Sequence, residues 1–123
     1  MRRLVPLLAA LLLAPTASAT THPIPGRYGG HEKHGPRAIH FALLRDSAHK
    51  LEVFNFRITH NGHTNTYFHS AHLYAGSHFR FFTPEGEVDI SGKWTGPGTV
   101  EGMVFIQDGH SYHFTAHHLN EVP

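Results

Sequence analysis

Histidine is the residue type through which this sequence offers the most chemistry. The chain has 14 histidines, more than its 10 lysines and arginines or its 9 aspartates and glutamates. It has no cysteine, which excludes disulfides, thiol nucleophiles and cysteine-ligated metal sites. Neutral imidazole is a good ligand for Cu(II), Ni(II) and Zn(II). We therefore expect weak binding of divalent transition metals at several sites.

Spacing decides which histidines can share an ion. Four pairs of histidines are three residues apart: His31/His34, His60/His63, His69/His72 and His110/His113. In a strand, this offset directs the two side chains to opposite faces. His60 and His63 are the exception, because the intervening Asn61-Gly62 favours a two-residue hairpin turn. The residues that flank such a turn share a face with Cβ atoms about 5 Å apart, so both imidazoles can bind one metal ion. Continuing this register places His69 on the same face, further from the turn.

The first residues have the pattern of an export signal. Arg2-Arg3 precedes an apolar run over residues 4–14, and Ala17-Ser18-Ala19 is a small-x-small cleavage site. We predict a signal peptide over residues 1–19, cleaved after Ala19, and a secreted (extracellular or periplasmic) product. The apolar run is too short to span a bilayer, so we expect no stable membrane insertion after processing.

Cleavage after Ala19 creates a second candidate metal site. The new terminus reads Thr20-Thr21-His22. Its free α-amine, the amide nitrogens of Thr21 and His22, and the His22 imidazole supply four nitrogens in one plane, the geometry that Cu(II) and Ni(II) prefer. A histidine at the third position also arises by chance in so histidine-rich a chain. Cleavage one residue away would abolish the site.

The elements that must position these residues are strands. Residues 20–36 are rich in proline and glycine and are expected to form a lead-in segment, with at most one short strand around Arg27-Tyr28. Beyond it, β-branched and aromatic residues recur in short runs without a helical period. The predicted strands are 37–44, 50–59, 64–71, 77–82, 87–94, 99–107 and 110–118. We expect one antiparallel all-β domain over residues 37–123, with about seven or eight short strands, as a small barrel or a two-sheet sandwich.

Turn chemistry and alternation then predict registers and core. Asp108-Gly109 is interpreted as a second two-residue hairpin turn, which would pair Gln107 with His110 and Val104 with His113. Thr83-Pro84-Glu85-Gly86 predicts a four-residue turn. The predicted core residues alternate with polar ones: they are Phe41, Phe54, Phe56, Ile58, Phe79, Phe81, Val88, Ile90, Met103 and Phe105.

Glycine and aromatic spacing gives one resemblance. The motifs are Gly26-x-Tyr28-x-Gly30, Ile39-x-Phe41, Leu51-x-x-Phe54, Gly76-x-x-Phe79-x-Phe81, Val88-x-Ile90-x-Gly92 continuing to Trp94, and Gly98-x-x-x-Gly102. With these motifs, the chain resembles small secreted all-β domains of bacteria that have no assigned function. The resemblance implies a fold and secretion, and it implies no catalytic or binding residue.

Several function classes are disfavoured. The formal net charge of +1 argues against nucleic-acid binding. Neither a nucleophile elbow nor a His-Glu-x-x-His segment is present, so we expect no enzyme. The alternative to metal binding is a non-enzymatic module for a carbohydrate or small ligand, with the histidines as polar surface residues. Its candidate aromatic residues, which core and rim packing would also explain, are Tyr28, Tyr67, Tyr74, Trp94 and Tyr112.

Overall fold

The predicted all-β class is confirmed. The computed structural model describes residues 22–67, 70–75, 77–83, 88–107 and 109–119, and within them the regular elements are all strands. Their bounds are β1 Gly26–Glu32, β2 Ala38–Arg45, β3 Leu51–His60, β4 His63–Tyr67, β5 Ala71–His72, β6 His78–Phe82, β7 Val88–Gly96, β8 Thr99–Ile106 and β9 Ser111–His118.

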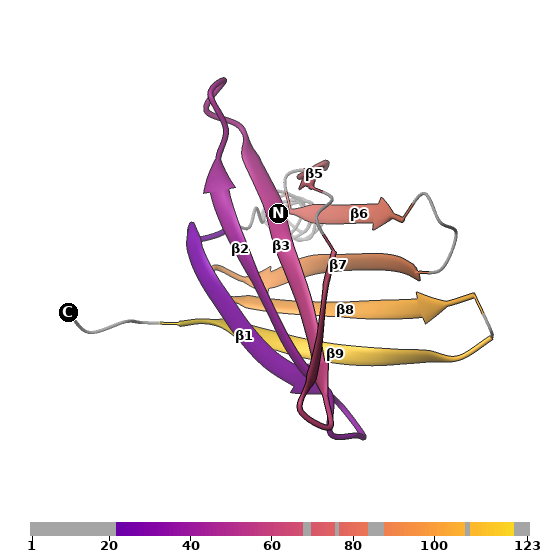
Figure 1. Cartoon of the computed structure of the whole chain (residues 1–123). Coiled ribbons are helices and arrows are strands. Elements are labelled where there is room, and N and C mark those ends of the chain that lie inside the picture. Colours follow the sequence, from indigo (N-terminus) through magenta and orange to yellow (C-terminus); the bar gives the residue numbers. More distant parts are fainter. Residues whose placement is uncertain (1–21, 68–69, 76, 84–87, 108, 120–123) are drawn as a thin grey trace, which may run out of the picture.

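The strands form one antiparallel sheet that curls over itself into a half-barrel. The order is β4-β3-β2-β1-β9-β8-β7-β6, and β5 pairs with β3 outside this path. In Figure 1 the strands β1–β3 run steeply up the view, whereas β6–β9 run across it behind them. The β1–β9 pairing joins these two halves. The apolar faces of the halves enclose the core.

Aromatic side chains fill this core. Tyr28 of β1 stacks on Phe41 of β2 with ring centroids 5.2 Å apart, and Phe41 stacks on Phe56 of β3 at 5.4 Å. Trp94 of β7 meets the Tyr28 ring edge-on at 5.5 Å, and Phe114 of β9 meets Phe56 at 5.7 Å. Edge-to-face and offset pairs of this kind add stability beyond the area they bury. The core therefore links strands from both halves of the sheet.

The strand that the sequence allowed around Arg27-Tyr28 is present as β1, so the lead-in segment expected over residues 20–36 is shorter than predicted. Seven of these residues form β1, which lies between β2 and β9 in the sheet. The glycines that indicated a loop have a packing role instead. A Cβ on Gly30 would overlap the carbonyl oxygen of Thr115 in β9, so only glycine permits so close an approach of the two backbones.

The predicted strand 64–71 is also wrong, because two elements replace it. Strand β4 pairs with β3 from His60↔His63 to Phe56↔Tyr67, and β5 pairs with a different part of β3 through Glu52↔His72 and Val53↔Ala71. Asn55 lies between the two paired stretches with φ 57°. The alternation of buried side chains changes there: Val53 and Phe56 are buried and Phe54 is only partly buried.

The β8–β9 hairpin also differs from its prediction. The backbone N–H of Ile106 donates to the carbonyl of His110, so the loop comprises residues 107–109 and Gln107 does not pair with His110. The register shifts by one residue relative to the prediction, giving Val104↔Tyr112 and Met103↔His113. A one-residue shift exchanges the two faces of a strand.

The core prediction fails on this strand for the same reason. Val104 is fully buried, whereas Phe105 is 51% exposed and Met103 is only partly buried. The other predicted core residues, apart from Phe54, are buried: Phe41, Phe56, Ile58, Phe79, Phe81, Val88 and Ile90. Most of the predicted turn at 83–86 lies outside the described residues. In the parts of the chain described, there is no helix long and apolar enough to cross a membrane.

Candidate metal centre

One imidazole and two carboxylates meet at the turn between β2 and β3. The first member, Asp46, opens this turn directly after β2. Its Oδ1 accepts hydrogen bonds from the backbone N–H groups of Ala48 at 2.8 Å and Lys50 at 2.9 Å. Such local side-chain-to-backbone bonds are the reason that aspartate favours turns. They fix the carboxylate and leave Oδ2 for another partner.

The other two members are a cross-strand pair. Glu52 in β3 lies opposite His72 in β5. Nε2 of His72 is 2.7 Å from Oδ2 of Asp46 and 3.2 Å from Oε2 of Glu52. The His72 side chain is 53% exposed, while the two carboxylates are largely covered. The three side chains thus converge from a turn and two strands, with one side open to solvent.

The electrostatics of the cluster favour an ionised Asp46. The hydrogen bond to His72 is the main cause that lowers the pKa of the Asp46 carboxyl from 3.8 to about 2, followed by the Lys50 backbone N–H. Two carboxylates beside one nitrogen also repel each other. A single Nε2–H can donate a full hydrogen bond to only one of the two carboxylates. A cation bound between them would therefore neutralise negative charge that a neutral imidazole leaves unbalanced.

The donor set fits a borderline divalent cation. One ligand atom from each residue lies within 4.8 Å of the other two. Tetrahedral Zn(II) with bonds of about 2.0–2.2 Å places its ligand atoms roughly 3.4 Å apart. The separation between Nε2 and Oε2, 3.2 Å, is close to that value, whereas the Asp46 oxygen at 2.7 Å would have to withdraw by roughly 0.7 Å. Solvent can supply a fourth ligand on the exposed side.

The His60 and His63 pair has the predicted geometry. The two residues lie directly opposite each other, and Asn61 and Gly62 have φ values of 54° and 75°, as a two-residue hairpin turn requires. Both imidazoles line a depression of about 230 Å³. Arg37, whose guanidinium lies 4.8 Å from the centre of the Tyr112 ring, lines the same depression. Among the described residues, no third histidine or carboxylate completes a ligand group with this pair.

The remaining predicted ligands are not brought together. His22 is exposed ahead of β1, and Thr20 and Thr21 lie outside the described residues. His69 also lies outside them. Of the pair His69/His72, therefore, the structure places only His72, and the partners of His72 are the carboxylates of Asp46 and Glu52.

The aromatic residues separate into buried and exposed ones. Tyr28 and Trp94 are core residues, and Tyr67 and Tyr112 pack partly buried against the core. Burial is the main cause that raises the pKa of Tyr112 to about 12. Tyr74, which follows β5, is 53% exposed. Core and rim packing therefore describes four of the five, and Tyr74 is the one presented to solvent.

Asp46 and Glu52 were not predicted from the sequence as ligands. A local signal for Asp46 does exist, since it opens the turn between two predicted strands. The pairing of Glu52 with His72 has no local signal, because it depends on a two-residue strand returning to β3. No protein-family model matches the chain, and neither curated proteins nor solved structures give a significant match.

Proposed function

We propose that this protein is a secreted β domain that binds a divalent transition metal, namely Zn(II), Cu(II) or Ni(II), at Asp46, Glu52 and His72. The observation that carries the proposal is the position of His72 Nε2 within 3.2 Å of two carboxylate oxygens from separate elements. Mixed imidazole and carboxylate sets suit these ions. The hydrogen bonds from Ala48 and Lys50 to Asp46 supply the outer support that orients a ligand.

His60 with His63, and Thr20-Thr21-His22, remain separate and weaker candidate sites. The hairpin pair offers two imidazoles beside the cation Arg37, which disfavours a bound dication. The terminal site exists only if the signal peptide is cleaved after Ala19. Sequencing the N-terminus of the secreted protein tests that cleavage and the export together.

Metal titration of the purified protein tests the main site. Saturation at 100 times Kd stabilises the folded state by about 2.7 kcal/mol, which for a domain of this size raises the melting temperature by about 11–22 °C. We expect Zn(II) to produce this shift and Mg(II), a harder ion, to produce little. His72→Ala should abolish the Zn(II) shift and the first equivalent counted by equilibrium dialysis.

Two other variants locate the binding. His34→Ala is the matched control, because His34 is an exposed imidazole outside the three candidate sites, and it should behave as wild type. The double variant His60→Ala/His63→Ala should keep the first equivalent. If His72→Ala binds the first equivalent as tightly as wild type does, the site is not at this cluster. Loss in the double variant would then assign the ion to the hairpin.

A second candidate function is binding of a carbohydrate or small ligand. The observation that favours it is a groove beside the exposed Tyr74. Binding of either kind requires no catalysis, and we propose that the protein is not an enzyme.

A further inference from the structure

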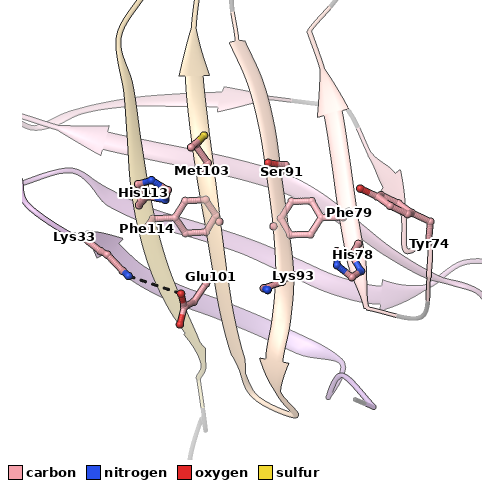
Figure 2. A pocket seen from close by; sticks show the side chains of 12 residues that line it. Lys33, Tyr74, His78, Phe79, Ser91, Lys93, Glu101, Met103, His113 and Phe114 are labelled. Atoms are coloured by element: carbon pink, nitrogen blue, oxygen red, sulfur yellow. Dashed lines mark ion pairs between the residues drawn. The ribbon is translucent and has the colours of Figure 1, made fainter. Parts of the chain in front are cut away.

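A groove crosses the outer face of the half-sheet formed by β6–β9 (Figure 2). Its volume is about 330 Å³. Gly92 of β7 and Gly102 of β8 are directly paired in its floor. Their neighbours Phe79 and Phe114 are fully buried, with rings that occupy the space where a Cβ on either glycine would lie. The floor is therefore rigid backbone supported from behind by the aromatic core.

Two rows of side chains flank this floor. His78, Lys93 and Glu101 form one cross-strand row. Ser91, Met103 and His113 form the other. Lys33 lies at the β9 end of the groove and Tyr74 at the β6 end, as Figure 2 shows. The groove thus runs across the strands β6–β9, between the two rows of side chains.

The charge of the groove is positive. Lys33 and Lys93 line it with only one carboxylate, that of Glu101. Lys33 pairs with Glu101 at 3.8 Å, and about half of each side chain is exposed. Ion pairs this open contribute little and rearrange easily. Lys93 makes no ion pair with any described residue, although it lies opposite Glu101. An anionic group entering the groove would therefore meet an available ammonium.

The β6 end adds an aromatic wall and an unpaired polar atom. The exposed Tyr74 ring stacks on the His78 imidazole with centroids 5.6 Å apart. Nδ1 of His78 is enclosed and has no hydrogen-bond partner among the described residues. A buried polar atom without a partner costs free energy, but a covered atom is out of reach of a ligand, so this end of the groove offers mainly the exposed Tyr74 ring.

A second depression extends the groove along the same face. Its volume is about 280 Å³, and it shares Tyr74, Ser91 and Met103 with the first. Phe105, which is half exposed, lines its far side. Arg80 also lies there but is held by Asp89 through bonds of 3.0 and 2.6 Å, so it is not an available cation. The extended surface therefore has two exposed aromatic rings, Tyr74 and Phe105, among polar groups.

We propose that this groove binds an acidic oligosaccharide, a chain of sugar rings that bear carboxylate or sulfate groups. The inference rests on the second candidate function and names its ligand class. Aromatic side chains with a polar tip suit ligands that are apolar on one side and wet on the other, and sugar rings have such faces. In this arrangement Lys93 binds an acidic group, Tyr74 stacks on a ring, and Ser91 bonds a hydroxyl.

Calorimetric titration with three tetrasaccharides tests the proposal: tetragalacturonate, a sulfated tetrasaccharide and neutral cellotetraose. We expect one acidic tetramer to bind, and the one that binds identifies carboxylate or sulfate as the recognised group. Lys93→Gln should weaken that binding about tenfold, as expected for loss of a charged hydrogen bond. Tyr74→Ala should weaken it about fivefold. Lys50→Gln, which removes an exposed lysine from the β2–β3 turn, is the matched control and should stay within twofold of wild type.

The outcomes separate the inference from the function on which it rests. Equal affinity for cellotetraose would overturn acidic recognition but leave carbohydrate binding in place. An equal loss in Lys93→Gln and Lys50→Gln would mean that general charge, and not this groove, attracts the ligand. If no tetramer binds at millimolar concentration, both the inference and carbohydrate binding are wrong. Circular dichroism of each variant confirms that the fold is intact.

Discussion

The Tyr28 hydroxyl is the polar centre of an otherwise apolar core. It accepts a hydrogen bond from Nε1 of Trp94 at 2.9 Å and donates one to the carbonyl of Ile24 at 2.6 Å. Tyr28 is fully buried and Trp94 nearly so. The hydroxyl therefore joins β7 to the segment that precedes β1. Burial is the main cause that raises the Tyr28 pKa above 10.0, so the group remains a donor at every ordinary pH.

Replacing Tyr28 with phenylalanine keeps the ring and its stacking but leaves the Trp94 N–H without an acceptor. An unsatisfied buried donor costs about 1–3 kcal/mol. At about 4–8 °C per kcal/mol for a domain of this size, a loss of about 2 kcal/mol lowers the melting temperature by about 8–16 °C. Urea unfolding followed by tryptophan fluorescence measures the same loss and reports directly on Trp94.

Tyr74→Phe is the matched control, because the same hydroxyl is removed from an exposed ring. It should change the free energy of unfolding by less than about 0.5 kcal/mol. If Tyr28→Phe is equally mild, the hydroxyl does not hold the Trp94 donor and the reasoning is refuted.

Two further predictions follow from the β8–β9 register and from the Asp46 cluster. Phe114→Ala should lower the free energy of unfolding by about 3–5 kcal/mol, whereas Phe105→Ser should change it by less than about 0.5 kcal/mol. Urea denaturation measures both changes, and a larger loss for Phe105→Ser would place Phe105 in the core. Because the folded pKa of Asp46 is lowered from 3.8 to about 2, its stabilising effect is complete above pH 3.8 and is lost as the pH falls through 2. Melting curves between pH 5 and 2 should therefore show a smaller acid-range loss for Asp46→Asn than for wild type.

Turn residues predicted one hairpin correctly and the other wrongly. Asn61-Gly62 sets its hairpin by itself, because both residues adopt positive φ. Asp108-Gly109 gives the same signal in sequence, but the loop there comprises residues 107–109. Hairpin loops of two and three residues both use a glycine at positive φ, and Gly109 has φ 103°. Because the prediction counted two loop residues where the structure has three, it assigned the two faces of β8 the wrong way round. It therefore placed Phe105 in the core, where the structure has Val104.

The glycines of β1 led to an underestimate of the length of this strand, for a related reason. A run containing Gly26, Gly29 and Gly30 favours a loop when only local preferences are considered. In the folded chain this run is an interior strand, and Gly30 admits the backbone of β9 at a distance that no side chain allows. Because the demand for glycine comes from a strand more than eighty residues away in the sequence, no local pattern reveals it.

At the candidate site too, the sequence indicated which residue types are present but not where the fold places them. Histidine content led to the prediction of metal binding, and His72 belongs to one of the pairs that the sequence singled out. Its placement depends on β5, whose only described ladder is the two residue pairs with β3. The backbone continues from His72 through Leu73, whose N–H donates to the Leu51 carbonyl, to Tyr74, whose N–H donates to that of His78. The segment that carries His72, the proposed metal ligand, therefore also carries Tyr74, the aromatic wall of the groove, two residues further along the chain.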